Sequence, residues 1–193
     1  MKLSSFALTF IMVLPIAVKA QPSPPITVKA QPSSPTANDL LKEAFVQAGN
    51  EHKNVFVMFH ASWCGWCHKM DSSINDKSCK KFFDDNYVIR HLVVDESRDK
   101  KNLENPGADQ LRTKYHGDDE GIPFWLVFDK DGNLLADSQI RPDGTSLNAK
   151  GENVGCPAAE KEVAHFIEVL KKTSHIKADE QAAIQKRFRK NEN

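Results

Sequence analysis

The chain has 193 residues, with 26 basic and 26 acidic side chains, so its formal net charge at pH 7 is zero. Because neither sign of charge dominates, the composition gives no reason to expect a nucleic acid or an anionic membrane as a partner. The length suits one domain with additional terminal segments, and four cysteines are too few for a scaffold held together by disulfides.

The N-terminal residues have the organisation of a signal peptide. Lys2 gives a positive start, residues 6–18 form an apolar run, and Val18-Lys19-Ala20 provides small residues for cleavage. The run is shorter than a comfortable transmembrane helix and contains Pro15, so an uncleaved anchor is the weaker alternative. We therefore predict a signal peptide over residues 1–20, a periplasmic or secreted protein, and no stable membrane insertion after processing.

Two further segments lie outside the predicted domain, and we assign them no chemistry. Residues 21–37 are rich in proline and serine, a composition typical of a flexible, partly polyproline linker. The domain itself is predicted over residues 38–174. Residues 175–193 are predicted to be a charged C-terminal tail with helical potential, and they contain a basic cluster of Lys186, Arg187, Arg189 and Lys190.

The domain is predicted to begin with a helix and a buried strand. Apolar residues recur at helical spacing after residue 38, and Gly49-Asn50 ends the pattern; the apolar positions are Leu40, Leu41, Ala44, Phe45 and Ala48. Residues 55–59 are nearly all apolar, as expected of a strand in the middle of a sheet that is covered on both faces.

The remaining elements predict the fold class. We expect helices over residues 68–74, 78–86, 107–115 and 157–172, strands over 87–94, 124–128 and 134–136, an Asp131-Gly132 hairpin turn, and a polar insertion over 137–156. This order predicts an α/β three-layer sandwich, with a central mixed sheet of about four strands and helices on both faces.

A pair of cysteines lies where the buried strand passes into the next helix. Trp63-Cys64-Gly65-Trp66-Cys67 places Cys64 at the helix start, where free backbone N–H groups and the helix dipole favour a thiolate. Cys67 follows three residues later, faces the same side and can close a disulfide. We therefore predict a redox-active dithiol in which Cys64 is the nucleophile and Cys67 is the resolving thiol.

The motif also carries a family resemblance. WCGWC differs from the WCGPC of thioredoxin only at Trp66, and Phe59 and Ala61 precede it while Ile122-Pro123 follows much later. With these residues the chain resembles the thioredoxin superfamily over roughly residues 38–173. The resemblance is specific at the motif and weak elsewhere. Exported thioredoxin-like proteins of bacteria are the most similar group.

The resemblance implies a thioredoxin-like fold and a substrate-binding surface around the dithiol. Pro123 is expected to be cis and to lie beside the cysteines, with Ile122 offering backbone groups to a bound substrate chain; a trans proline that opens an edge strand is the alternative. The contact surface is expected to include Trp63, Gly65, Trp66, Ile122 and Pro123. Neither a cofactor nor a metal is expected.

The sequence departs from thioredoxin beneath the cysteines. Met58 stands where thioredoxins keep a buried Asp that assists proton transfer to the resolving thiol, so the proton route is open. His60 is near enough in sequence to substitute for that Asp, and a surface histidine at the end of a strand is the alternative.

The cysteines allow other interpretations. The motif could be a static disulfide or half of a zinc site, but Cys79 and Cys156 do not supply a second ligand pair at suitable spacing. Cys64-Gly65-Trp66-Cys67-His68 also fits the C-x-x-C-H pattern of covalent haem attachment. We expect Cys79 and Cys156 to lie too far apart for a disulfide, although the 137–156 insertion could bring them together.

The sequence therefore predicts an exported thiol–disulfide oxidoreductase that reduces protein disulfides through Cys64 and Cys67. Its expected partners are proteins with disulfides or thiols and an upstream electron-donor protein, because an oxidising compartment does not regenerate a dithiol. No nucleic acid is expected. The alternatives are a chaperone or assembly factor that holds client thiols without turnover, and a haem carrier.

Overall fold

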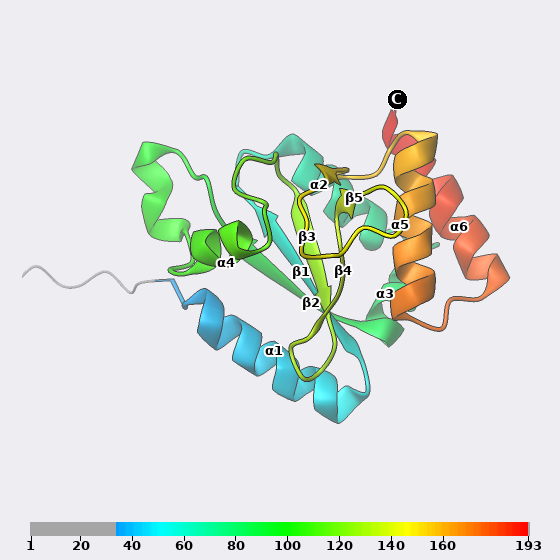
Figure 1. Ribbon diagram of the computed structural model, residues 1–193, viewed down its shortest axis with the longest axis horizontal. Coiled ribbons are helices and arrows are strands. Elements are labelled where there is room, and N and C mark those ends of the chain that lie inside the picture. Colours follow the sequence, from blue (N-terminus) through cyan, green and yellow to red (C-terminus); the bar gives the residue numbers. More distant parts are fainter. Residues whose placement is uncertain (1–33, 193) are drawn as a thin grey trace, which may run out of the picture. The chain divides into compact units, whose positions relative to one another are not determined.

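A central sheet with helices on both of its faces organises the molecule (Figure 1). The computed structural model describes residues 34–192, so the predicted signal peptide and most of the predicted linker lie outside the described residues. Within that part of the chain, no helix is both long enough and apolar enough to cross a bilayer. The strand order is β2-β1-β3-β4, which confirms the predicted α/β sandwich with a four-stranded mixed sheet.

The strands lie where the sequence predicts them. β1 (Asn54–His60) runs parallel to β2 (Tyr87–Val93) and antiparallel to β3 (Phe124–Phe128). β3 in turn pairs antiparallel with β4 (Leu134–Asp137) through the predicted hairpin. Each strand agrees with its predicted range to within one residue at either end, because runs of apolar residues and a strong turn mark these strands locally.

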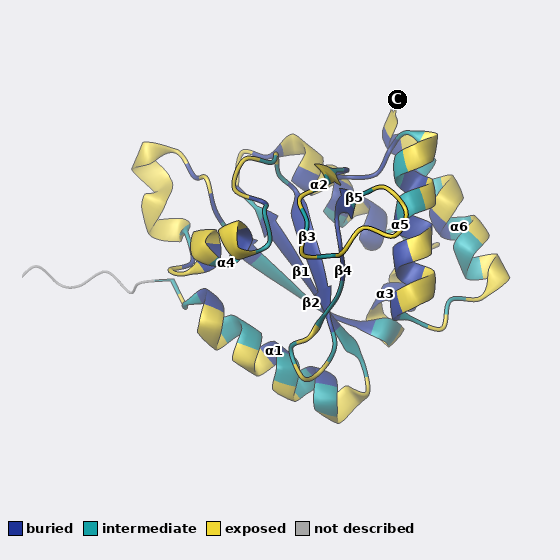
Figure 2. Ribbon diagram, in the orientation of Figure 1, coloured by how far each residue is buried: buried dark blue, intermediate teal, exposed yellow. Residues whose placement is uncertain are grey.

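The side chains of β1 alternate between two hydrophobic cores, one on each face of the sheet. Val55, Val57 and Phe59 enter one core, whereas Phe56 and Met58 enter the other. All five have no exposed surface, and in Figure 2 the dark blue of buried residues covers most of β1 and β3, whereas β2 is partly teal. Double-sided burial is the reason why this strand is a continuous apolar run rather than an alternating one.

Helices of two groups supply these cores. The core around Phe59 is covered by α1 (Ala37–Glu51) and α4 (Ala108–Lys114). The core around Phe56 is covered by four further helices, which are α2 (Gly65–Ile74), α3 (Lys80–Asn86), α5 (Glu160–Thr173) and α6 (Ala178–Arg189). A short 3-10 helix, η1 (Arg98–Leu103), lies in the loop after β2.

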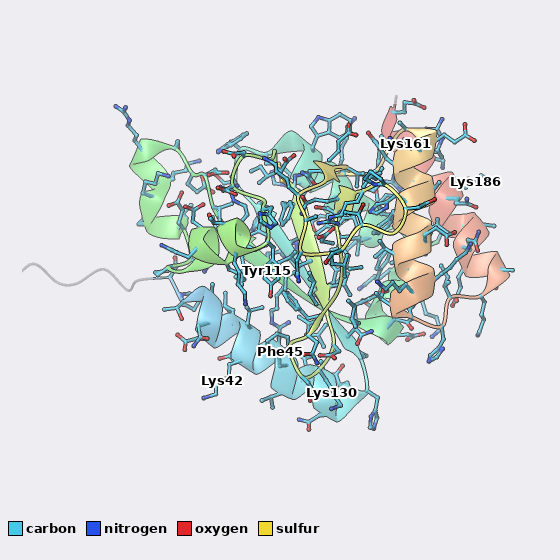
Figure 3. All side chains as sticks on the ribbon, viewed as in Figure 1. Lys42, Phe45, Tyr115, Lys130, Lys161 and Lys186 are labelled. Carbon is cyan, nitrogen blue, oxygen red and sulfur yellow. A yellow bond between two sulfur atoms is a disulfide. The ribbon has the colours of Figure 1, made fainter. Side chains whose placement is uncertain are left out.

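The first of these cores includes an aromatic contact that joins α1 to the end of α4. Phe45 and Tyr115, both labelled in Figure 3, pack against Phe128 of β3 with ring centroids 6.0 and 5.6 Å from it. Edge-to-face pairs of this kind stabilise a core beyond the area that they bury. The contact ties both helices to the same strand.

The domain begins slightly earlier than predicted. Thr36 caps α1, because its Oγ1 accepts a hydrogen bond of 3.1 Å from the backbone N–H of Asp39. A threonine in this position satisfies one of the free N–H groups of the first turn. The end of the segment that the sequence assigned to the linker is therefore the cap and first residue of a helix.

The polar insertion over 137–156 has a folded centre. Two short strands, β5 (Gln139–Ile140) and β6 (Glu152–Asn153), form a ribbon of their own. Arg141 and Asp137 form a bidentate ion pair of 2.8 and 2.7 Å, and their side chains are only 6% and 1% exposed. Charged residues four apart usually indicate a solvated surface, so the sequence did not indicate that this pair is buried.

The C-terminal segment is part of the second core. Ile184 and Phe188 of α6 have no exposed surface, and the ring of Phe188 lies 4.8 Å from that of Phe166 of α5. A last 3-10 helix, η2 (Lys190–Glu192), places the buried side chain of Asn191 against Ser73 of α2. The segment predicted as a charged tail thus packs on the domain, and the two apolar residues at i and i+4 were its only sequence signal.

Candidate active site

The two cysteines of the motif lie at the beginning of α2, as predicted. Cys64 is the N-cap residue of this helix, and Cys67 is in its first turn. Their sulfur atoms form a disulfide, with the Cα atoms 5.3 Å apart. Cys64 is 3% exposed and Cys67 is fully buried, so Cys64 is the more accessible of the two. The backbone N–H of Cys67 points at Cys64 Sγ over 3.1 Å, which is the contact that favours a thiolate at Cys64 in the reduced protein.

The Ile122-Pro123 pair lies beside the disulfide. The Ile122–Pro123 peptide bond is cis, as the resemblance implied. Cys64 Sγ lies 3.6 Å from the carbonyl oxygen of Ile122. The side-chain amide of Asn153 donates hydrogen bonds to the carbonyl oxygens of Gly121 and Pro123, at 2.7 and 3.2 Å. The β5–β6 ribbon therefore supports the proline loop from outside.

Two tryptophans of the motif face solvent: Trp63 precedes Cys64, and Trp66 lies between the two cysteines. Trp63 is 60% exposed and Trp66 is 48% exposed. The indole nitrogen of Trp63 donates a hydrogen bond of 2.8 Å to the carbonyl oxygen of Asp95, and the ammonium of Lys69 lies 4.4 Å from the ring centroid of Trp66. The position between Cys64 and Trp66 is open, because a Cβ added at Gly65 would meet no atom within 4 Å. Of the predicted contact residues, Trp63, Gly65 and Trp66 are thus exposed beside the disulfide, whereas Ile122 is half-buried and Pro123 is buried.

A buried carboxylate, which no sequence pattern indicated, holds the loop before Cys64. Glu96 is 4% exposed and accepts hydrogen bonds from the backbone N–H and the hydroxyl of Ser62, at 2.5 and 2.8 Å. Burial alone would raise the pKa of Glu96, but the two hydrogen bonds from Ser62 outweigh burial and hold the pKa below its ordinary value. Its place in the chain could have indicated it. Glu96 follows β2, the cysteines follow β1, and parallel neighbouring strands end at the same edge of a sheet.

A second missed residue is Arg112 of α4. Its guanidinium is 4% exposed and pairs with both carboxylate oxygens of Asp95, at 2.5 and 3.1 Å, and with Asp109 at 2.9 Å. Because Asp95 also accepts the hydrogen bond from Trp63, the buried arginine supports the exposed indole through one intermediate residue.

His60 lies at the end of β1 within a small cluster of titratable side chains. Its ring centroid is 5.1 Å from that of His91, and His91 Nε2 is 2.8 Å from a carboxylate oxygen of Asp71. Burial, together with the neighbouring His91, lowers the pKa of His60. Met58 is fully buried, so the position of the thioredoxin Asp is filled by an apolar side chain. His60 is half-buried rather than a free surface histidine.

The other two cysteines are buried free thiols. Burial raises the pKa of Cys79, and it raises the pKa of Cys156 to about 12. Cys79 is the N-cap residue of α3, whereas Cys156 lines a cavity of about 390 Å³ together with Trp66 and Pro123. The two residues are not bonded to each other, in agreement with the expectation from their predicted places in the fold.

The arrangement at the C-x-x-C-H pattern does not fit a covalently attached haem. Such an attachment needs both sulfur atoms and the histidine ring to face one open cavity. Cys67 has no exposed surface, and Nε2 of His68 lies 3.1 Å from the carbonyl oxygen of Ser62. Among residues 34–192, no three His, Cys, Asp or Glu side chains converge as metal ligands would.

Comparisons with known proteins give the following similarities. Residues 36–130 match the family model described as Thioredoxin-like. A disulphide isomerase from Xylella fastidiosa Temecula1 is 19% identical over 85% of this chain and 97% of that one, with a TM-score of 0.46. A DsbH oxidoreductase is 20% identical over 79% of this chain and 93% of that one, with a TM-score of 0.39. The germline-specific thioredoxin Deadhead from Drosophila melanogaster is 23% identical over 55% and 84% of the two chains, with a TM-score of 0.35. The search of curated protein sequences found no match.

Proposed function

Because residues 36–130 match the family model described as Thioredoxin-like, we propose that the protein is a thiol–disulfide oxidoreductase that reduces disulfides of other proteins. The observation that carries the proposal is the position of the Cys64–Cys67 pair. It lies at the N-terminus of α2, beside the cis Ile122–Pro123 peptide, and two exposed tryptophans, Trp63 and Trp66, belong to the same motif. A dithiol in this place combines a nucleophilic sulfur with an apolar surface that an unfolded or flexible polypeptide can contact.

The reaction begins with reduced protein and a client disulfide. The Cys64 thiolate attacks one client sulfur, the client S–S bond breaks, and the departing client thiolate takes up a proton. The new bond joins Cys64 to the client. The Cys67 thiolate then attacks Cys64 Sγ, releases the second client thiolate, which is also protonated, and forms the Cys64–Cys67 disulfide. The client gains two electrons, and the Cys64–Cys67 pair loses them.

A second protein must complete the cycle. The Cys64–Cys67 disulfide returns to the dithiol when a donor dithiol attacks it by the same exchange chemistry and is itself oxidised. The requirement follows from the proposed compartment, because oxidising compartments keep thiols oxidised. We propose an exported location on the strength of the first 20 residues, with their positive start, apolar run and small-residue cleavage context. N-terminal sequencing of protein recovered from outside the cytosol tests this, and full-length protein confined to the cytosol would contradict it.

Reduction of insulin by dithiothreitol tests the chemistry. The wild-type protein should accelerate the reduction, and Cys64→Ser should abolish the acceleration. Cys67→Ser should instead accumulate a mixed disulfide with the client, because the resolving thiol is absent. Cys79→Ser is the matched control, since it removes a buried free thiol outside the motif. Acceleration that persists in Cys64→Ser would contradict the proposal.

The direction of the reaction is tested by the reduction potential of the Cys64–Cys67 pair. A value near the thioredoxin potential of about −270 mV supports a reductase, whereas a value near about −120 mV is that of a strong oxidant. The measurement is an equilibrium titration with a glutathione redox buffer, read by mass after alkylation.

Exposure of Trp63 and Trp66 also favours a second candidate function, which is a chaperone that holds client thiols without turnover. The two functions differ in their dependence on sulfur. A chaperone suppresses the aggregation of an unfolded client when Cys64 and Cys67 are both serine, whereas an oxidoreductase loses its effect on that client's thiols.

A further inference from the structure

Two surface hollows lie close to the dithiol, and they differ in their charges. The first is the cavity of about 390 Å³ beside Trp66 and Pro123, which carries three glutamates. The second is a groove of about 500 Å³ that lies between α2 and the C-terminal residues. We call this second hollow the basic groove. Gly65 lines one end of it, and its titratable or charged lining residues are His68, Lys69, Asp76, Arg187 and Lys190.

The glutamates of the first cavity are already matched within the chain. Glu162 accepts two hydrogen bonds of 2.9 Å from the backbone N–H groups of Ala158 and Ala159 at the start of α5. Glu120 lies 3.4 Å from the ammonium of Lys150, and Glu192 lies 2.7 Å from the guanidinium of Arg189. Two of the three glutamates thus have a cation partner, and the third is held by backbone N–H groups at a helix N-terminus.

The basic groove is different, because two of its three strong cations have no carboxylate partner. Arg187 pairs with Asp76 at 3.1 Å. Lys69 donates only to the carbonyl oxygen of Asn191, at 3.1 Å, while it lies over the ring of Trp66. Within residues 34–192, neither Lys69 nor Lys190 forms an ion pair. Both are exposed, so the groove presents unbalanced positive charge although the chain as a whole is neutral.

The basic cluster of the C-terminal segment is divided by the fold. Arg189 pairs with Glu192, and Arg187 pairs with Asp76. Lys186 is exposed on α6 outside the groove, where Figure 3 labels it. Lys190 alone adds an unpaired positive charge to the groove, opposite Lys69 of α2. The C-terminal residues thus bring charge to the helix that carries the dithiol.

We propose that the basic groove binds an acidic stretch of polypeptide that adjoins the reacting cysteine of the protein with which this chain exchanges disulfides. The inference rests on the proposed function, since it names a feature of that partner. The groove begins at Gly65, between the two cysteines, and follows the exposed side of α2 as far as Asp76. A partner chain whose cysteine is at Cys64 is therefore in reach of Lys69 and Lys190 with the residues that flank its cysteine. Charge complementarity favours Asp and Glu at those positions.

The test uses matched peptides that differ only in the residues flanking one cysteine, which are Glu, Gln or Lys. Each cysteine is presented as a disulfide, and the second-order rate with the reduced protein is measured at about 0.01 M and about 1 M salt, where the Debye length is about 30 Å and about 3 Å. The Glu peptide should react about fivefold faster than the Lys peptide at low salt, as expected for two exposed ion pairs. At high salt the ratio should fall towards one.

Charge-reversal variants test whether Lys190 of the basic groove is responsible for the peptide preference. Lys190→Glu should abolish the preference for the Glu peptide over the Lys peptide at low salt, because it places a negative charge opposite Lys69 and brings the net charge of the groove to zero. Lys186→Glu makes the same change in net charge on the same segment but outside the groove, so it should leave the preference as in the wild type. A preference that Lys186→Glu changes as much as Lys190→Glu would assign the effect to the overall charge of the protein and overturn the proposal.

The remaining outcomes separate this inference from the proposed function. If the Gln peptide is reduced but the Glu and Lys peptides react at equal rates at low salt, the oxidoreductase stands and the groove does not bind acidic segments. If no peptide is reduced, the proposed function fails. In that case calorimetry with a Glu peptide that has serine in place of cysteine tests the groove by itself. The peptide should bind the wild type more tightly than Lys190→Glu, and equal binding would overturn the proposal. Binding to phosphatidylserine vesicles without any peptide preference would overturn the proposal in favour of a membrane surface.

Discussion

The carbonyl oxygen of Asp95 accepts a hydrogen bond of 2.8 Å from the indole nitrogen of Trp63, although Trp63 is 60% exposed. Asp95 has a φ of 53°, in the left-handed region that few non-glycine residues adopt. Its carboxylate is held by the buried guanidinium of Arg112. The exposed indole beside the dithiol is therefore fixed by polar contacts that end inside the domain.

Replacing Arg112 should loosen this support. Arg112→Ala removes the hydrogen bonds to Asp95 and Asp109, and we expect a loss of about 2 kcal/mol in the free energy of unfolding, measured by urea titration. Because Trp63 loses its fixed acceptor, KM for a protein client should rise, while the rate with a small aromatic disulfide should change less. Arg98→Ala, at an exposed arginine of η1, is the control. Equal effects of Arg112→Ala on large and small disulfides would contradict a positioning role.

Glu96 should make stability depend on pH in the acid range. Hydrogen bonds from Ser62 outweigh burial and hold the pKa of Glu96 in the folded protein below its ordinary value of 4.5. The unfolded chain therefore binds a proton at higher pH than the folded chain does. The contribution of Glu96 is complete above about pH 4.5 and is lost as the pH falls through the folded pKa.

The measurement compares wild type with Glu96→Gln by urea unfolding at a series of pH values. The wild type should be the more stable protein near neutral pH, and the difference should shrink below about pH 4.5. Glu43→Gln, at an exposed glutamate of α1, should show no such pH-dependent difference. A difference between wild type and Glu96→Gln that stays constant down to the acid transition would show that the Ser62 contacts do not depend on the charge.

Phe188 should be as important to the domain as a residue of the central sheet. It has no exposed surface and packs on Phe166 and Phe83. Phe188→Ala should cost about 3–5 kcal/mol in the free energy of unfolding, because it leaves a cavity in the second core. Gln185→Ala, on the exposed side of the same helix, should change the stability by less than about 0.5 kcal/mol. Similar stabilities for the two variants would mean that α6 is a dispensable tail.

The four cysteines should differ widely in reactivity. In the reduced, folded protein, iodoacetamide at neutral pH should modify Cys64 first, because its sulfur faces backbone N–H groups and is the more accessible one of the pair. Burial raises the pKa of both Cys79 and Cys156, the latter to about 12. These two should react more than about a hundredfold more slowly until the chain unfolds. Peptide mass spectrometry of timed samples measures each rate, and rapid labelling of Cys156 would contradict its burial.

The parts of the molecule that could be predicted from the sequence are those whose structure is determined by residues close together in the chain. The β1 run and the position of Cys64 follow from a few consecutive residues, and the strand ranges agree with the structure accordingly. Contacts between distant parts could not be predicted in the same way. Arg112 and Asp95 are 17 positions apart, and only the packing of α4 beside β2 makes them neighbours.

In the 137–156 insertion and the C-terminal segment, charged residues hid the burial of the chain from sequence-based prediction. Asp137 and Arg141 have the spacing of a solvated helical pair, yet their side chains are 1% and 6% exposed. The C-terminal segment is misleading for the same reason, because its many charges conceal Ile184 and Phe188. In both cases a partner or a covering element, supplied by the tertiary fold, decides the burial of the segment.

The open space around Gly65 has a practical meaning for engineering. A side chain at this position would meet no neighbour, and Trp66 next to it already projects into solvent. Libraries that randomise both positions would therefore sample new potentials and client preferences while leaving the architecture intact.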